Sequence, residues 1–129
     1  MDVRRIILLV AVFFLFGCKP GADKAISLAQ NEVASSMKDP DSAKFRYVRY
    51  IASGESEDGT VSGFVCGNIN AKNSYGAYAG YSPFIVKISM KAKGLFSKGV
   101  DYTIENKLIM SDDTSQNVKY YTDTCGQDE

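Results

Sequence analysis

The first 18 residues constrain this chain most, because they indicate that the remainder folds only after export. Arg4 and Arg5 precede eleven consecutive apolar residues, 6–16, and the small residue Gly17 follows. A basic segment, a short apolar segment and a small residue in this order are typical of a secretory signal peptide. Eleven helical residues span about 16 Å, well short of the roughly 30 Å hydrocarbon core of a bilayer. We therefore predict a cleaved signal peptide over residues 1–17 rather than a permanent transmembrane helix.

The junction Leu15-Phe16-Gly17-Cys18 resembles the lipobox of bacterial lipoproteins. The resemblance implies that the Cys18 thiol is diacylated, that cleavage occurs before Cys18, and that the new amino group is acylated. Several acyl chains together anchor a protein stably in a membrane. Lys19, in place of aspartate, implies sorting to the outer membrane with the domain facing the periplasm; display outside the cell is the alternative. An ordinary signal peptide followed by a chance cysteine is the other interpretation of the junction.

The three cysteines divide into one lipidation site and one pair. With Cys18 acylated, Cys66 and Cys125 are left in an oxidising environment, where an even number of cysteines indicates a disulfide. Closing a loop of about 60 residues would stabilise the fold by roughly 4 kcal/mol in the chain-entropy model. Two separate buried thiols are the alternative. A catalytic thiol is disfavoured, because the sequence has no histidine to activate it.

Composition argues against two classes of protein. The 15 basic and 15 acidic side chains balance, and a near-neutral domain lacks the concentrated basic surface that nucleic-acid binding normally needs. The missing histidine is the commonest general base and metal ligand near neutral pH. We therefore expect no nucleic-acid partner, no enzymatic activity, no metal and no cofactor.

Residues 18–129 are long enough for one domain. Residues 18–22 form a short tether, and Asp23 is the expected N-cap of a helix that continues to about Lys38. Pro40 ends this helix, since it disfavours helical geometry in the preceding residue. Apolar side chains recur at helical spacing and predict a helix lying on a core; these are Ile26, Ala29, Val33 and Met37. A helix on the membrane surface is the alternative, but its polar face lacks the usual cationic stripe.

Two strands are predicted next, over residues 45–52 and 60–71. A polar loop joins them and ends in the turn signal Asp58-Gly59. The second strand has apolar side chains on both faces, which indicates a central position in a sheet. Gly63 and Gly67 would allow close approach of neighbouring groups there.

Residues 84–91 alternate strictly between apolar and polar side chains, which predicts a further strand. The stretch 100–110 gives one or two more strands, with Asn106 as a candidate turn. Together with the preceding pair, these segments predict an antiparallel sheet of three to five strands.

Thr114 or Ser115 is expected to cap a last helix. Val118, Tyr121 and Cys125 would share one face of it. The order of helix, sheet and helix predicts a single α+β domain in two layers over residues 23–129.

Two stretches resemble a family of small exported proteins of bacteria and their prophages. One is Lys38-Asp39-Pro40-Asp41-Ser42-Ala43-Lys44-Phe45. The other is Val65-Cys66-Gly67-Asn68-Ile69-Asn70-Ala71-Lys72-Asn73-Ser74-Tyr75-Gly76-Ala77-Tyr78, continuing with Ala79-Gly80-Tyr81 and Phe84. A late cysteine on a C-terminal helix, here Cys125, belongs to the same pattern. The resemblance implies the fold and the disulfide, and it implies no particular biochemical activity.

The segment from Asn70 to Tyr81 is the candidate binding loop. Its tyrosines recur at every third residue among Gly, Ser and Asn, a mixture that offers rigid aromatic anchors beside adaptable hydrogen-bonding groups. The candidate contact residues are Asn70, Lys72, Asn73, Tyr75, Tyr78 and Tyr81. The alternative is a structural loop, in which the tyrosines fold back over the sheet edge and the two asparagines bond the backbone.

Together these observations predict a non-enzymatic envelope lipoprotein, anchored to the membrane through Cys18, that binds an envelope protein partner. The five residues from Cys18 to Asp23 reach at most about 17 Å, so the domain would be held against the headgroups, with its partner in or beside that membrane. Host-surface modification of a prophage type, such as superinfection exclusion, ranks first. A structural accessory lipoprotein of an envelope assembly is the alternative, and an envelope hydrolase is disfavoured.

Overall fold

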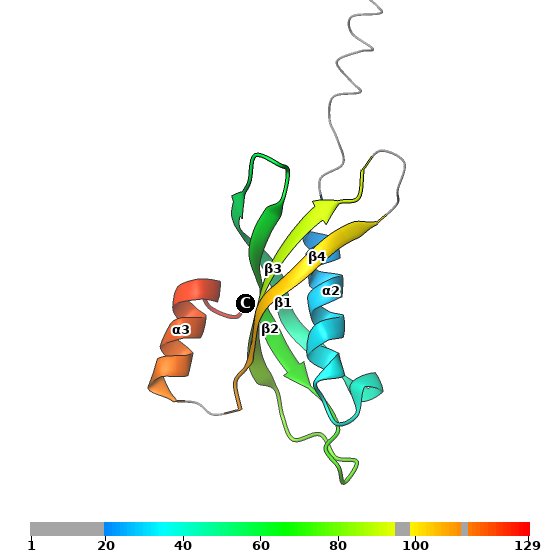
Figure 1. Cartoon of the computed structure of the whole chain (residues 1–129). Helices are drawn as coiled ribbons and strands as arrows, with labels where there is room; N and C mark the ends of the chain where they lie inside the picture. The colour runs from blue at the N-terminus through cyan, green and yellow to red at the C-terminus, as the bar shows by residue number, and fades with distance from the viewer. Residues whose placement is uncertain (1–19, 95–98, 112–113) are drawn as a thin grey trace, which may run out of the picture.

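The computed structural model describes residues 20–94, 99–111 and 114–129. The predicted signal peptide, Cys18 and Lys19 lie outside these residues. Along the chain come α2 (Ala22–Ser35), the short 3-10 helix η1 (Pro40–Ser42), β1 (Lys44–Glu55), β2 (Val61–Asn70), β3 (Ser82–Ala92), β4 (Val100–Ile109) and α3 (Ser115–Cys125). The four strands form one antiparallel sheet in the order β1-β2-β3-β4, with β1 and β4 at its edges (Figure 1). The α+β class and the central position of β2 are confirmed.

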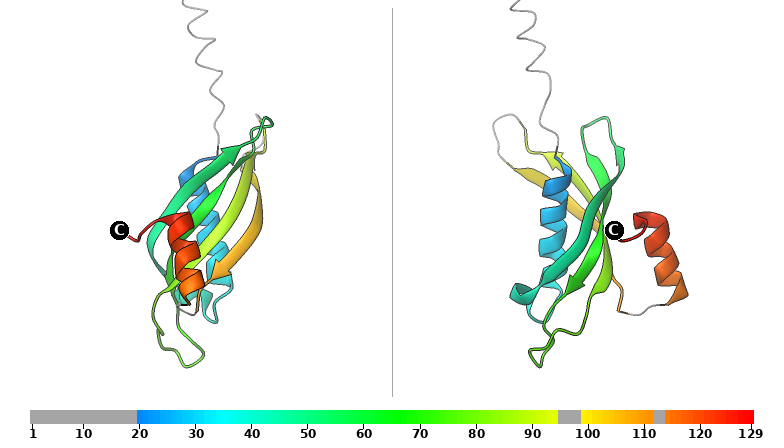
Figure 2. Two further views of the ribbon diagram at one scale, coloured as in Figure 1. Left: turned by 90° about the vertical axis from the view of Figure 1, so that its left-hand side faces the viewer. Right: turned by 180° about the vertical axis from the view of Figure 1, so that it is seen from behind.

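The two helices lie on opposite faces of the sheet (Figures 1 and 2). α2 packs on the larger core, whose buried side chains include Val65, Phe84, Val86, Ile88 and Met90. α3 packs on a smaller cluster formed by Cys66, Ile85, Met110, Tyr121 and Cys125. Successive residues of β2 and β3 therefore pack into different clusters, because side chains alternate between the two faces of a strand. The expected two layers are therefore corrected to three, with α3 as the additional layer.

α2 begins and ends slightly earlier than predicted. Its N-cap is Gly21, so the predicted N-cap Asp23 is wrong; that carboxylate lies in the first turn, where the helix dipole favours negative charge. The helix ends at Ser35 rather than near Lys38. The Ser35 hydroxyl donates to the Glu32 carbonyl oxygen at 2.7 Å, a local bond that competes with continuation of the helix.

The turn between β1 and β2 is confirmed. Gly59 adopts a φ of 87°, a left-handed conformation that glycine accepts without steric cost. The Ser56 amide donates to the Thr60 carbonyl oxygen at 2.8 Å and closes the turn. β1 continues to Glu55, three residues beyond the predicted end.

β1 contains a bulge that the sequence pattern did not predict. Arg46 pairs with Asn68 and Arg49 pairs with Cys66, so Tyr47 and Val48 together face Gly67. Tyr47 has a φ of 55°, the only left-handed non-glycine conformation in the described residues. The extra residue reverses the alternation of side chains beyond it. As a result, Arg46 and Arg49 lie on the same face of the sheet, the face that carries α3.

β4 is one continuous strand, so the candidate turn at Asn106 is wrong. Lys87 pairs with Asn106 and Ile88 with Ile104, which leaves Glu105 as the extra residue of a bulge in β4. A bulge bends a strand without interrupting it.

α3 begins where predicted and is held by the predicted disulfide. The Thr114 hydroxyl accepts a hydrogen bond from the Asn117 amide at 3.3 Å and caps the helix. Cys66 and Cys125 are bonded, with their Cα atoms 5.9 Å apart. Tyr121 is buried beside them, while Val118 is half exposed at the margin of the packed face. Within the described residues, no helix has the length and apolar character needed to cross a membrane.

Candidate functional site

The loop of residues 71–81 lies at the end of the sheet opposite to the start of α2 (Figures 1 and 2). α2 extends along the sheet from one end to the other, and η1 and the start of β1 follow at its far end. Pro20 instead lies beside the hairpin of β1 and β2, where it helps to line a hollow with Glu55 and Val61. The 71–81 loop and the N-terminal side of the domain are therefore separated by about the length of a strand.

The two asparagines of the predicted site shape the loop. The Asn73 Oδ1 atom accepts from the amides of Tyr75 (2.9 Å) and Ala77 (3.2 Å), and the Asn73 amide donates to the Ala77 carbonyl oxygen. The Asn70 Oδ1 atom accepts from the Gly80 amide at 3.2 Å. Both side chains thus accept hydrogen bonds from backbone amides of the loop, as expected if the loop is structural.

Tyr78 fixes the loop to the turn before β1. Its hydroxyl donates to the Ser42 carbonyl oxygen at 2.9 Å, and the Ser42 hydroxyl accepts from the Lys72 amide at 2.8 Å. The Lys44 ammonium lies 4.5 Å from the centre of the Tyr78 ring, and that of Lys72 lies 5.9 Å away. The face of this tyrosine is therefore occupied by two cations.

Tyr81 and Tyr75 have different surroundings. The Arg46 guanidinium carbon lies 4.0 Å from the centre of the Tyr81 ring and 5.4 Å from that of Tyr47. Such cation–π contacts orient the cation over the ring. Tyr75, at the tip of the loop, is 95% exposed. One tyrosine of the predicted loop is thus free, and two hold cations.

We name this surface the basic tyrosine patch. It comprises Lys44, Arg46, Tyr47, Lys72, Tyr75, Tyr78 and Tyr81. Sequence reasoning missed its three β1 residues, because they precede the loop by about 30 positions. The only available signal was the run of basic and aromatic residues in residues 44–50.

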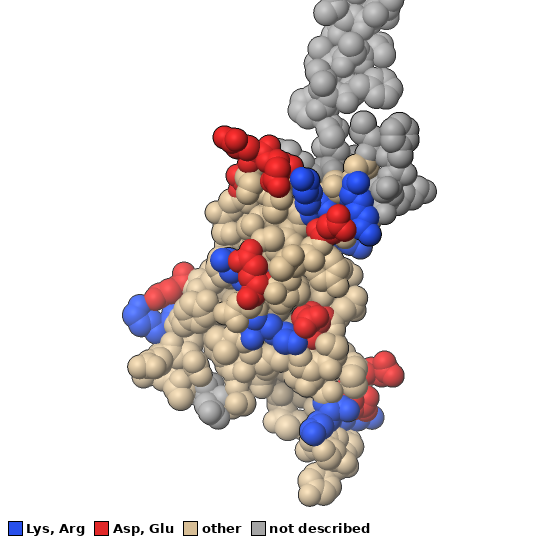
Figure 3. Space-filling model, in the orientation of Figure 1, with Lys and Arg blue, Asp and Glu red and all other residues tan. Residues whose placement is uncertain are grey.

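The cations of the patch differ from most of the other basic residues in the described residues, although Lys24 and Lys38 likewise have no carboxylate partner there. Six basic side chains elsewhere form ion pairs with carboxylates; these are Arg49, Lys87, Lys91, Lys93, Lys107 and Lys119. Among residues 20–94, 99–111 and 114–129, no carboxylate pairs with Lys44, Arg46 or Lys72. Figure 3 shows acidic and basic groups interspersed on the visible face, with the tip of the 71–81 loop, at the bottom, uncharged.

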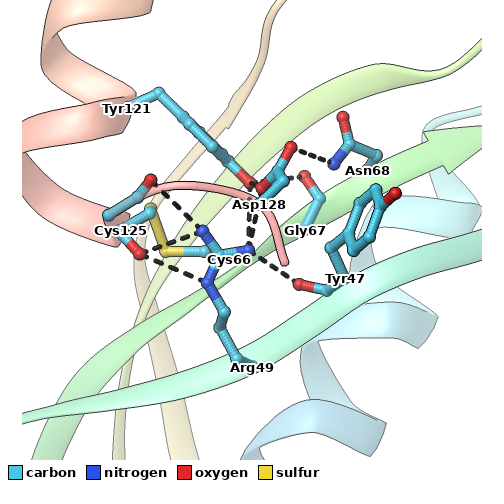
Figure 4. The surroundings of a disulfide bond; sticks show 9 residues. Tyr47, Arg49, Cys66, Gly67, Asn68, Tyr121, Cys125 and Asp128 are labelled. Carbon is cyan, nitrogen blue, oxygen red and sulfur yellow. Dashed lines mark hydrogen bonds and ion pairs between the residues drawn. A yellow bond between two sulfur atoms is a disulfide. The ribbon is translucent and has the colours of Figure 1, made fainter.

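A second cluster of ionisable groups surrounds the disulfide (Figure 4). Arg49 donates to the Cys125 carbonyl oxygen through Nε (3.2 Å) and Nη2 (2.9 Å), and to Asp128 Oδ1 at 3.0 Å. Asp128 also accepts from the Asn68 amide group at 2.8 Å and from the Tyr121 hydroxyl at 2.6 Å. A guanidinium at the C-terminal end of α3 is favoured by the helix dipole. These bonds attach the end of α3 and the C-terminal tail to β1 and β2.

The pKa values in this cluster reflect the same contacts. Burial and the hydrogen bond to Asp128 raise the pKa of Tyr121 to about 12. For Asp128, burial alone would raise the pKa, but hydrogen bonds from Tyr121, Asn68 and Arg49 outweigh it and lower the pKa. Each polar group is engaged in holding the fold, so we assign this cluster a structural role.

Among the described residues, hollows also lie outside the patch, and two of them differ in size. The larger, about 410 Å³, is lined mainly by apolar groups beside Pro20. Its lining residues are Pro20, Tyr50, Ala52, Gly54, Glu55 and Val61. The smaller, about 100 Å³, lies between α3 and the start of β3. Across the described parts of the chain, no three His, Cys, Asp or Glu side chains are placed to hold a metal ion.

Comparisons with known protein families, curated proteins and solved structures found no match to this chain. The structure defines a disulfide-linked α+β domain with a helix on each face of a four-stranded antiparallel sheet. What the basic tyrosine patch can bind therefore depends on its own residues and contacts.

Proposed function

We propose that this protein is a membrane-anchored envelope lipoprotein that acts as a non-enzymatic binding protein, with the basic tyrosine patch as its contact surface. The single observation behind this proposal is that three cations, which lack a carboxylate partner in the described residues, contact three tyrosine rings beside the exposed Tyr75. Tyrosine and arginine are the residue types that most often dominate binding energy at protein interfaces. The partner in this proposal is a protein of the envelope.

The sequence before the domain and the disulfide within it support the envelope location. Residues 1–17 have the order of a signal peptide, and the Cys18 junction resembles a lipobox. The Cys66–Cys125 disulfide suits an oxidising compartment, since disulfides are rare in reducing ones. Lys19 after the lipidated cysteine favours the outer membrane, with the domain in the periplasm.

The position of the patch indicates how far from the membrane the partner would bind. An anchor at Cys18 would hold the Pro20 end of the domain against the headgroups. β2 has ten residues and, at about 3.3 Å per residue, spans roughly 33 Å. The patch would therefore face away from the membrane, about 30 Å from it, so the partner must extend that far into the periplasm.

Within this class, a prophage-type protein that modifies the host surface, for example by superinfection exclusion, is our preferred function. The resemblance of residues 39–45 and 65–78 to small exported proteins of bacteria and prophages supports it. Cells that produce the protein should then resist infection by a phage that sensitive cells admit. The Cys18→Ser variant should lose that protection, because it lacks the anchor.

A crosslinking experiment tests the contact surface. A photoreactive amino acid in place of Tyr75 should capture a partner from the membranes of cells that produce the lipidated protein. The matched control replaces Tyr102, which is 48% exposed on the edge strand β4, far from the patch. We expect a discrete adduct from position 75 and none from position 102. Equal capture at both positions, or none at either, would contradict the assignment.

A further inference from the structure

We infer that the basic tyrosine patch binds an acidic protein segment, docked on its unpaired cations; this deepens the proposed function and rests on it. The first argument is charge. Along the same sheet, Lys87 pairs with Glu105 at 2.7 Å and Lys91 with Asp58 at 3.5 Å. The chain as a whole is neutral. Cations that form no ion pair among the described residues, at one end of a neutral domain, attract and orient an anionic partner.

The second argument is the orientation of Arg46. Its guanidinium lies over the Tyr81 ring, and among the described residues no hydrogen-bond acceptor contacts its side chain. A guanidinium that stacks through its face keeps its N–H donors free at the edge, in the planar fork that binds a carboxylate through two hydrogen bonds. The ring contact also holds the side chain in place before binding, which reduces the entropy lost when a partner docks.

The third argument distinguishes a protein segment from a lipid or nucleic-acid surface. Three cations are few for a nucleic acid, which demands a longer basic surface. The anchor would direct the patch away from its own membrane. Tyr75 adds an almost fully exposed aromatic ring, beside glycine, serine and asparagine, as in loops that bind proteins. Asp39 is the N-cap of η1 and Asp41 lies within it, so an acidic segment would approach from the side of Tyr81 and Tyr47 rather than over that turn.

Fluorescence anisotropy with the full-length lipidated protein in detergent tests this inference. The probe is a fluorescein-labelled peptide of about a dozen residues in which Glu and Gly alternate. One triple variant removes the patch cations: Lys44→Gln, Arg46→Gln and Lys72→Gln. A control triple removes the same charge from paired lysines elsewhere: Lys91→Gln, Lys93→Gln and Lys119→Gln. We expect the patch triple to weaken peptide binding by about tenfold or more, and the control triple by about twofold at most.

Several results would overturn the inference. They are equal losses in both triples, no binding of the peptide by the unaltered protein, or tighter binding to phosphatidylglycerol vesicles than to the peptide. Circular dichroism of each variant keeps a folding defect from being mistaken for lost binding. The proposed function is tested separately by crosslinking from position 75. If capture persists in the patch triple, the binding function stands and the acidic partner is wrong; if position 75 captures nothing, the proposed function fails.

Discussion

Arg46 and Arg49 show how the same residue type serves two roles on one strand. The bulge at Tyr47 places both side chains on the α3 face of the sheet. Arg49 is then surrounded by acceptors from the end of α3 and from the tail, whereas Arg46 lies over tyrosine rings at the surface. One arginine is therefore structural, and the other is available for binding.

Replacing Arg49 with methionine should lower the free energy of unfolding by about 2 kcal/mol, because the carboxylate of Asp128 and the Cys125 carbonyl oxygen lose their donors. Urea unfolding monitored by circular dichroism measures this difference. Arg46→Met is the matched control and should leave the urea midpoint unchanged. Equal effects of the two substitutions would contradict the division of roles.

Tyr121 should make stability sensitive to alkaline pH. Its pKa in the folded protein is raised to about 12, against about 10 in an unfolded chain. The stability contributed by the protonated hydroxyl is therefore fully present below pH 10 and is lost as the pH rises from about 10 to about 12. The urea midpoint should fall over this window, and less so in Tyr121→Phe.

Tyr75→Phe is the control for this pH dependence, because the Tyr75 ring is 95% exposed. Its midpoint should follow the pH dependence of the unaltered protein. If Tyr121→Phe and the unaltered protein lose stability equally between pH 10 and pH 12, the hydroxyl of Tyr121 is not the responsible group.

At the scale of elements, the packing of β1 on β2 depends on glycines that carry no side chain. A Cβ atom at Gly63 would lie 2.5 Å from Tyr50 Cε2 and 2.6 Å from the Ile51 carbonyl oxygen. One at Gly67 would lie 3.0 Å from Val48 Cγ2. The bulge and the Tyr50 ring thus fill the space that a larger residue in β2 would need.

Gly63→Ala should destabilise the protein by about 2 kcal/mol, because the added methyl group meets backbone as well as a ring. Gly54→Ala, in the same hairpin, is the control, since nothing lies within 4 Å of its Cβ position. Thermal unfolding should show a lower midpoint for the first variant and no loss for the second. A midpoint for Gly63→Ala equal to that of the unaltered protein would mean that β1 and β2 accommodate the methyl group without loss of stability.

α3 depends on its attachments more than on its own composition. Thr, Asn, Tyr and Asp have modest helix propensity, and they make up most of its 11 residues. The helix is instead stabilised by the disulfide, the Arg49 contacts and the Thr114 cap. The C-terminal helix is thereby held on a face of the sheet that would otherwise expose Ile85 and Cys66.

For the whole molecule, the start of α2 and the 71–81 loop lie at opposite ends of the sheet (Figure 2), so an anchor at Cys18 would leave the patch at the far end. We predict that this arrangement persists on vesicles that carry the lipidated protein. A fluorophore attached through Asp58→Cys, at the anchor end, should be quenched by a headgroup-linked quencher. One attached through Tyr75→Cys should be quenched little, since it would lie about 30 Å from the headgroups. Equal quenching at the two positions would mean that the domain lies flat on the membrane.

Much of the fold followed from local patterns. Alternation of apolar and polar side chains identified β3, apolar side chains on both faces identified the central β2, and the cysteine count identified the pair Cys66 and Cys125. Asp58-Gly59 marked a turn, and Thr114 marked the start of α3. These features are predictable because the backbone geometry of a strand, turn or helix end restricts which residue types suit it.

Other features were decided only by the tertiary structure. The bulge at Tyr47 depends on how β1 pairs with β2, and a shift of one residue reverses every side chain beyond it, so no count along β1 could assign Arg49 to the α3 face. The patch joins Lys44 and Arg46 to Tyr78 and Tyr81 through strand pairing and loop closure across some 35 residues. The sequence by itself determined the strands, the disulfide and the tyrosine-rich loop, because each depends on the types of neighbouring residues or on the number of cysteines. The third layer, the partners of the tyrosines and the distance of the loop from the start of α2 arose only in three dimensions, because they depend on contacts between segments distant in the chain.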